Sequence, residues 1–262
     1  MYLVASLTPV LFAVVGAQQP TLLVTGATGR LGSELYSQAK ALSAFSEVRA
    51  LVTNLTEARL YLNCSACDAS EGIFVGDVTD LFTLAPAMAG ADAVAIAVGV
   101  SGDASADVQR AVEFDGVENQ VRALYSAPGG TAPSERQVVL CSSMGTTDPS
   151  PSPMEGGSVL FWKLNAEAQL LASDLRAVVV KPCGLTTDAS GTRELVTGHD
   201  DALLSLVPPT IPRADVARVM LASIVRRDAK LRFDLCATAG EPTTDLDALL
   251  ESARYPQTSP EL

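Results

Sequence analysis

The sequence predicts an α/β fold in which a parallel sheet is covered by helices on both faces. Short, almost continuously apolar segments alternate with stretches of helical periodicity through about the first 185 residues. Apolar strands of this kind are typical of parallel sheets buried on both faces. A glycine-rich segment, residues 25–32, lies directly between the first apolar segment and the first helical one. This order of strand, glycine turn and helix is typical of a Rossmann-type doubly wound sheet.

The expected elements follow one another in a regular order. The apolar strands are expected at residues 21–24, 48–52, 73–77, 93–98, 138–140 and 177–180. Helical stripes fall between them, at Leu31, Leu35, Ala39 and Leu42, at Leu81, Leu84 and Met88, at Phe114, Val117, Val121 and Leu124, and at Leu160, Leu164 and Leu171. A helix over 215–224, a short strand over 232–235 and a helix over 245–253 then form a small C-terminal elaboration of the same sheet. We expect this elaboration to supply one wall of a ligand crevice.

The glycine-rich segment predicts a binding site for the pyrophosphate of a dinucleotide. Its glycines let the backbone turn sharply and approach phosphates without a Cβ in the way. Free N–H groups and the positive end of the following helix dipole then face the anion. An ordinary glycine turn is the alternative, but the position between a strand and a helix favours the binding site. The expected contacts are Gly26, Thr28, Gly29, Arg30, Leu31 and Gly32.

Length and charge bound the class of protein. The chain has 262 residues, and we interpret residues 20–262 as a single dinucleotide-binding domain because no linker or repeat divides them. Its formal net charge is −12, which argues against a nucleic-acid partner, since that partner needs a basic surface. The expected ligands are therefore a cofactor and a small-molecule substrate.

Residues 1–19 form a hydrophobic N-terminal extension. The apolar run at residues 3–17 is shorter than the roughly 20 residues of a membrane-spanning helix, so no stable membrane span is expected. It resembles the apolar region of a secretory signal, although no Lys or Arg precedes it. It lacks the Arg and Ser content of a plastid transit peptide. The sequence leaves open whether the segment is a signal or an extension, and whether the location is cytoplasmic or plastid.

The five cysteines show no regular spacing, which predicts no disulfide framework. Cys64 and Cys67 have the C-x-x-C spacing of a redox or metal pair. A zinc site is not expected, because there is no second pair and the only histidine, His199, is far away in the sequence. We interpret Cys64 and Cys67 as a solvent-exposed loop pair able to oxidise, and His199 as a loop residue rather than a catalyst.

Polar and glycine-containing segments follow the predicted strands. They are residues 26–32, 76–78, 97–99, 141–145 and 181–185. Ligands bind at the carboxyl ends of the strands in this architecture, so we expect these segments to surround one crevice. The Pro- and Ser-rich run at residues 149–153 is expected to be a loop over it.

In combination these segments resemble the atypical short-chain dehydrogenase/reductases, the NmrA-like and plant plastid-type NAD(P)-binding proteins. The matching segments are residues 25–32, 76–80, 142–145, 162–163, 166–167, 181–185, 193–195 and 211–216. The resemblance covers roughly residues 21–240. It implies that Asp77 reaches the adenine, that Ser143 faces the nicotinamide and that Lys163 hydrogen-bonds the nicotinamide ribose. The remaining implied cofactor contacts are Val78, Val98, Gly99, Pro182, Gly184 and Leu185.

Two of these residues have structural alternatives, and one family residue is missing. Asp77 could cap the following turn, and Lys163 could form an exposed i,i+4 pair with Glu167. The family usually has a tyrosine as general acid four residues before the lysine, where this chain has Val159. A general acid contributes on the order of 10²–10⁴-fold, so ordinary carbonyl reduction is expected to be slow unless Ser143 or the substrate supplies the proton.

The resemblance leaves three functions open. The first is an oxidoreductase acting on a small organic substrate, with Ser143 and Lys163 as catalytic residues. The second is a non-catalytic NADP(H)-binding redox sensor or regulator, which the absent tyrosine favours. A sugar-nucleotide isomerase or epimerase ranks last because it needs the same tyrosine.

NADP is expected in preference to NAD. NAD selection commonly uses an acidic residue at the end of the second strand, and residues 52–54 contain none. Arg30 could pair with the 2′-phosphate of NADP. Relatives often have a further arginine where Thr53 stands, and its absence keeps NAD open.

Overall fold

The structure is a computed structural model that describes residues 19–147 and 157–254. Nearly all of the N-terminal extension and the run at residues 149–153 lie outside the described residues.

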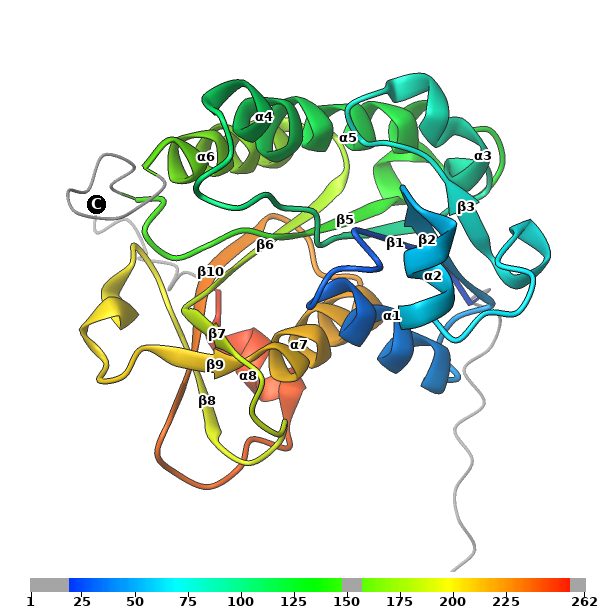
Figure 1. Cartoon of the computed structure of the whole chain (residues 1–262). Helices are drawn as coiled ribbons and strands as arrows, with labels where there is room; N and C mark the ends of the chain where they lie inside the picture. Colours follow the sequence, from blue (N-terminus) through cyan, green and yellow to red (C-terminus); the bar gives the residue numbers. More distant parts are fainter. Residues whose placement is uncertain (1–18, 148–156, 255–262) are drawn as a thin grey trace, which may run out of the picture.

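One ten-stranded sheet forms the centre of the molecule, in the order β3-β2-β1-β4-β5-β6-β10-β9-β7, with β8 paired to β10 (Figure 1). The strands from β3 to β10 along this path run parallel. They are β1 (Thr21–Thr25), β2 (Glu47–Val52), β3 (Ile73–Val75), β4 (Ala93–Ile96), β5 (Gln137–Cys141), β6 (Arg176–Pro182) and β10 (Leu231–Thr238). The chain reverses direction across the sheet between β1 and β4, where a doubly wound sheet opens a crevice. The predicted Rossmann-type fold is confirmed.

Helices cover both faces of this sheet (Figure 1). They are α1 (Gly32–Ala41), α2 (Leu55–Tyr61), α3 (Ala85–Met88), α4 (Ala106–Arg110), α5 (Gly116–Ser126), α6 (Gly157–Ala172), α7 (Arg213–Val225) and α8 (Leu246–Ser252). Successive residues of β1 point to opposite faces, so Leu22 and Val24 join the core with α1, α7 and α8, whereas Leu23 joins the core with α3, α5 and α6. Among the described residues, no helix is long and apolar enough to cross a membrane.

The C-terminal region departs most from the expected elements. The short strand expected at 232–235 is the eight-residue β10, which lies beside β6 in the main sheet. Three further strands, β7 (Gly184–Thr186), β8 (Glu194–Gly198) and β9 (Thr210–Pro212), extend the sheet beyond β10. Their sequences are short and lack an apolar alternation, so periodicity gave no signal for them. Elsewhere β3 and β4 end two residues earlier than expected, at Val75 and Ile96.

Short helical turns complete the chain. They are the 3₁₀ turns Ala69–Glu71, Leu81–Leu84, Pro133–Glu135 and Ala202–Ser205, and the π-helical turn η3 (Ala111–Asp115). The π-helical turn lies between α4 and α5 and widens the helix at Glu113. Such turns are rare and occur frequently at functional sites.

Candidate functional site

The glycine loop between β1 and α1 makes the sharp turn that its sequence predicted, with its glycines packed closely against neighbouring backbone. Gly26 has a φ of +68°, and a Cβ there would lie 2.7 Å from the carbonyl oxygen of Ala97. A Cβ on Gly32 would lie 2.0 Å from the carbonyl oxygen of Gly26, so neither position accepts a side chain. Gly29 is less confined, because its Cβ would meet only the Gly26 oxygen, at 3.0 Å. Gly26 and Gly32 therefore close the turn, while Gly29 leaves space at the start of α1.

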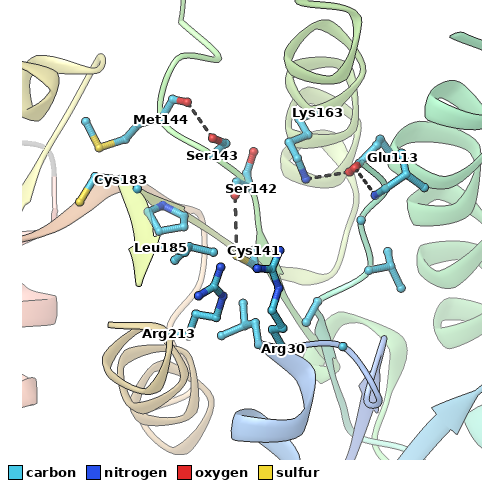
Figure 2. A pocket seen from close by; sticks show the side chains of 18 of the residues that line it. Arg30, Glu113, Cys141, Ser142, Ser143, Met144, Lys163, Cys183, Leu185 and Arg213 are labelled. Carbon is cyan, nitrogen blue, oxygen red and sulfur yellow. Dashed lines mark hydrogen bonds and ion pairs between the residues drawn. The ribbon is translucent and has the colours of Figure 1, made fainter. Parts of the chain in front are cut away.

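A cavity of about 700 Å³ lies over the carboxyl ends of β1, β4, β5 and β6 (Figure 2). Predicted site residues that line it are Gly29, Arg30, Leu31, Val98, Gly99, Ser143, Lys163, Pro182, Gly184 and Leu185. The structure thus brings together, from five separate segments, most of the residues expected to contact a cofactor. Gly26, Thr28, Gly32, Asp77 and Val78 are not among the lining residues.

Lys163 and Glu113 form a buried ion pair in this cavity. The Nζ of Lys163 lies 2.7 Å from Oε2 of Glu113, and Figure 2 shows the two side chains meeting across the gap between α6 and η3. The Glu113 side chain is 3% exposed and that of Lys163 15%. Oε1 of Glu113 also accepts a hydrogen bond of 3.0 Å from the backbone N–H of Val100. Lys163 is therefore held by a carboxylate that sequence reasoning missed, because Glu113 stands beside the apolar stripe of its helix.

Glu167 has a different partner from the one considered above. Its buried carboxylate accepts a 2.8 Å hydrogen bond from Nε of Arg232 on β10 and another from the hydroxyl of Ser142. The exposed pair of Lys163 with Glu167 is therefore wrong. Glu167 is therefore not a surface residue. Its bond with Ser142 holds the loop after β5 in place.

The loop after β5 is fixed by further contacts with β6 and beyond. The N–H of Ser142 donates to the carbonyl of Val180 at 2.8 Å, and that of Met144 donates to Pro182 at 3.0 Å. Ser143 lies between them, with its hydroxyl donating to the carbonyl of Met144 at 2.8 Å and its side chain on the cavity wall (Figure 2). The Ser143 hydroxyl is thus held on a rigid loop by one local bond, from which it can rotate toward a ligand.

A buried cluster of charged residues also holds the loop after β5 in place. The fully buried Lys181 lies 2.6 Å from Asp201 and 3.0 Å from Asp234, and it donates to Thr147 at 3.2 Å. Burial opposes the ionisation of Asp201, but hydrogen bonds from Lys181 and from the backbone of Gly145 and Thr147 hold the pKa of this carboxyl below its usual range. Lys181 belongs to the segments that resemble the family, but it does not line the cavity. Its contacts with Asp201, Asp234 and Thr147 give it a structural role.

Cys141 lines the cavity but lacks the character of a nucleophile. Its side chain is buried at the end of β5, and burial raises the pKa of the thiol to about 11, although the nearby Lys163 ammonium lowers it. The thiol is therefore neutral near pH 7 and unreactive. Val159, where the family has its tyrosine, lies on α6 one turn before Lys163, and no described residue lining the cavity is a tyrosine.

Asp77 takes up the capping role that the sequence left open. Its Oδ1 accepts hydrogen bonds of 2.8 Å from both the backbone N–H and the hydroxyl of Thr79. Asp77 is exposed at the end of β3, and Val78 beside it is buried against Gly116. The contact of Asp77 with an adenine stays a prediction.

Two disulfides correct the interpretation of the cysteines. Cys183, on the cavity wall, is joined to Cys236 of β10 with an S–S distance of 2.06 Å, although the two are 53 residues apart. The spacing of the cysteines did not predict this disulfide, because the two residues come together only when β10 lies beside β6. Cys64 and Cys67 are also joined, at 1.94 Å, and Cys67 is 2% exposed, so the expected solvent exposure of the pair is wrong for this residue.

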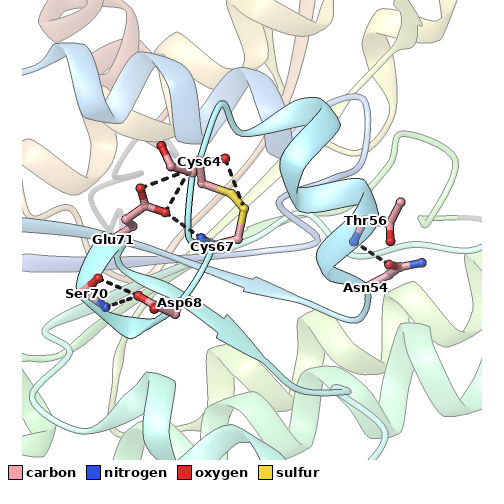
Figure 3. The surroundings of a disulfide bond; sticks show 8 residues. Asn54, Thr56, Cys64, Cys67, Asp68, Ser70 and Glu71 are labelled. Atoms are coloured by element: carbon pink, nitrogen blue, oxygen red, sulfur yellow. Dashed lines mark hydrogen bonds between the residues drawn. A yellow bond between two sulfur atoms is a disulfide. The ribbon is translucent and has the colours of Figure 1, made fainter.

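Figure 3 shows how the Cys64–Cys67 loop is held. The carboxylate of Glu71 accepts a 2.6 Å hydrogen bond from the N–H of Cys67 and a 3.1 Å bond from that of Ser65. These bonds lower the pKa of Glu71. The sulfur atoms are bonded to one another, so the group formed by Cys64, Cys67 and Glu71 offers no thiolate to a metal.

The fold and the cavity together define a dinucleotide-binding protein of the Rossmann class. The turn that excludes side chains at Gly26 and Gly32, and the space left at Gly29, fit a pyrophosphate at the start of α1. The sequence profile of the family described as NAD(P)H-binding matches residues 26–227. The chain therefore belongs to this family, in its atypical short-chain dehydrogenase/reductase-like branch, and is an NAD(P)-binding protein of oxidoreductase type.

Individual relatives agree with this assignment. An uncharacterized chloroplastic protein of Arabidopsis thaliana is 32% identical over 87% of this chain and 74% of its own length. Sanguinarine reductase of Eschscholzia californica is 30% identical over 90% of this chain and 97% of its own. A candidate NAD-dependent epimerase/dehydratase from Bacillus halodurans has the same fold, with a TM-score of 0.73 at 24% identity over 89% of this chain and 99% of its own.

Proposed function

We propose that the protein is an NADP(H)-dependent reductase of a small organic substrate. The observation that carries this proposal is the single cavity that runs from the glycine loop to Ser143 and Lys163. The relationship to sanguinarine reductase supports a reduction rather than an epimerisation. A nicotinamide bound there would supply a hydride to the substrate.

In this proposal the chain's own residues bind the cofactor, orient the substrate and donate a hydrogen bond to its oxygen. Backbone N–H groups of residues 30–31 hold the pyrophosphate at the start of α1, because the N–H of Gly29 already donates to the carbonyl of Gly26 at 2.9 Å. Pro182, Gly184 and Leu185 form the wall along the nicotinamide. The Lys163 ammonium, fixed by Glu113, donates a hydrogen bond to the ribose, and the Ser143 hydroxyl leaves the Met144 carbonyl to donate to the substrate oxygen. The hydrogen bond from Ser143 would stabilise negative charge that develops on that oxygen.

The preference for NADP(H) rests on the end of β2. Thr53 is exposed there, and Asn54 caps α2 by accepting the N–H of Thr56 at 2.8 Å, so neither supplies an acid for a ribose 2′-OH. One carboxylate opposes this preference, because Oε2 of Glu57 accepts a 3.3 Å hydrogen bond from the Thr28 hydroxyl in the glycine loop. Glu57 is exposed, so solvent screens its repulsion of a 2′-phosphate. The chloroplastic description of the Arabidopsis relative supports a plastid location.

A cofactor-binding sensor is the second candidate function. The observation that favours it is Val159, an apolar side chain on α6 where a proton donor is expected. The two candidates share the cofactor site and differ only in turnover.

The test is NADPH oxidation followed by absorbance across a panel of aldehydes, ketones and quinones, after calorimetric titration with NADPH and NADH. We expect NADPH to bind more tightly than NADH and at least one carbonyl to be reduced. Tight NADPH binding without any substrate-dependent oxidation would favour the sensor, and tighter binding of NADH would refute the cofactor preference.

A further inference from the structure

Two arginines from different helices enter the cavity on the side away from Lys163. Arg30 precedes α1 in the glycine loop, and Arg213 is the first residue of α7. Figure 2 shows their guanidinium groups side by side beneath Leu185, with Lys163 and Glu113 on the opposite side of the cavity. Both arginines also line an adjoining cavity of about 460 Å³, so they lie at the boundary between the two cavities.

Neither arginine has a partner of opposite charge in residues 19–147 and 157–254. No ion pair or side-chain hydrogen bond joins either guanidinium to another described residue. Asp215, in the same first turn as Arg213, is already engaged, with Arg218 at 2.6 Å and the N–H of Gly191 at 2.9 Å.

Two carboxylates line the adjoining cavity but are bonded elsewhere. Asp188 accepts a 2.7 Å hydrogen bond from the Thr186 hydroxyl, and Glu34 accepts a 3.4 Å bond from Gln38. Neither forms an ion pair with Arg30 or Arg213. The guanidinium N–H groups of Arg30 and Arg213 are therefore available to a ligand in these cavities.

The charge of the main cavity is consequently positive. Among residues 19–147 and 157–254, its charged lining residues are Arg30, Glu113, Lys163 and Arg213. Lys163 and Glu113 neutralise one another, which leaves the two arginines uncompensated. Burial and the neighbouring charge of Arg30 both lower the pKa of Arg213, so the folded protein holds these cations close together at a cost. A bound anion would remove that cost, since a planar guanidinium matches a phosphate or carboxylate.

We propose that Arg30 and Arg213 form an anion-binding site in the cavity, and that its ligand is a phosphate or carboxylate group. The proposal rests on the proposed function, because it uses the same cavity. Two sources can supply the anion: the pyrophosphate of the cofactor, or an acidic group on the substrate. The second source would define the substrate class as carbonyl compounds that carry an acidic group.

This placement also changes the role expected for Arg30. The 2′-phosphate of NADP belongs near the end of β2, yet residues 52–54 line neither of the two cavities that Arg30 lines. Arg30 instead faces Arg213 and Leu185. Its removal is therefore expected to affect NADPH and NADH alike rather than NADPH alone.

The experiment compares wild type with Arg213→Gln, Arg213→Lys and Arg30→Gln. Arg122→Gln is the matched control, because Arg122 is an exposed arginine on α5 that does not line the cavity. Calorimetry measures the binding of inorganic pyrophosphate, NADPH and NADH. Rates of NADPH oxidation are compared for 4-carboxybenzaldehyde and its uncharged methyl ester. Circular dichroism checks that each variant is folded.

The expected result is a loss of about 10-fold or more in anion binding for each Gln variant, with partial recovery in Arg213→Lys and no change in Arg122→Gln. If the cofactor is the source, NADPH and NADH weaken together and the ratio of acid to ester rates stays constant. If the substrate is the source, cofactor affinity is unchanged and the preference for the acid is lost. Folded Gln variants that retain pyrophosphate affinity, cofactor affinity and rate ratio would overturn the proposal. Absence of any carbonyl reduction in wild type would refute the reductase alone, because the pyrophosphate titration still tests the arginines.

Discussion

Replacing Glu113 with glutamine tests the ion pair that holds Lys163. The change removes the negative charge but keeps a side-chain oxygen able to accept the N–H of Val100. The Lys163 ammonium, 15% exposed, then lacks the carboxylate 2.7 Å away that compensates its charge. We expect the variant to fold, to be less stable and to hold Lys163 less firmly.

The magnitude follows from the burial of the pair. Removing one partner of a buried ion pair costs about 3–5 kcal/mol, because the other charge remains without compensation. Lys163 borders the cavity and can turn toward water, so we expect the lower end, about 3 kcal/mol. For a chain of this size about 1 kcal/mol lowers Tm by about 2–4 °C, so the expected decrease is about 6–12 °C.

A double-mutant cycle separates the pair from its surroundings. Thermal denaturation is measured for wild type, Glu113→Gln, Lys163→Met and the double variant. Because an apolar replacement of both partners is often nearly neutral, the double variant should lose less stability than the two single variants added together, by at least about 1 kcal/mol. Losses that add to within about 0.5 kcal/mol would refute the reasoning that the two charges are coupled.

Three further predictions concern the cofactor and the reaction. Gly29→Asp puts a carboxylate where the pyrophosphate is expected, so calorimetry should show that a folded variant has lost NADPH binding; unchanged affinity would remove the glycine loop from the site. Lys163→Ala should lower both NADPH affinity and turnover, whereas Ser143→Ala should lower mainly kcat, and robust turnover in both variants would place the chemistry elsewhere. Glu57→Gln should strengthen NADPH binding relative to NADH by about 2- to 5-fold, since the screened repulsion amounts to a few tenths of a kcal/mol up to about 1 kcal/mol; a constant ratio would mean that Glu57 does not face the ribose.

The sequence predicted those features of the fold that depend on local pattern. The parallel strands from β1 to β6 were expected because apolar runs and glycine turns are local signals. The extra strands β7, β8 and β9 were missed because they are short and their positions depend on pairing partners, β10 for β8 and β9, and β9 for β7, that local pattern does not reveal. The same distance in sequence hid the disulfide between Cys183 and Cys236.

The candidate site was predicted in part for a similar reason. Residues directly after strands, such as Ser143 and Leu185, were found because the ends of parallel strands meet at one edge of the sheet. Glu113 was missed because it reaches the cavity from a helical turn that no strand end marks, and Arg213 was missed because it follows β9, a strand that the sequence pattern did not predict. A carboxylate beside an apolar helical stripe was the only available signal for Glu113, and it could equally have marked a surface residue.

The crystal structure of the chain with NADP⁺ tests the central claim most directly. We predict electron density for the pyrophosphate over the N–H groups of residues 30–31, and for the nicotinamide ring between Leu185 and Ser143 with its ribose within hydrogen-bonding distance of Lys163. A dinucleotide bound outside the cavity, or with its nicotinamide end pointing away from Lys163, would contradict the account.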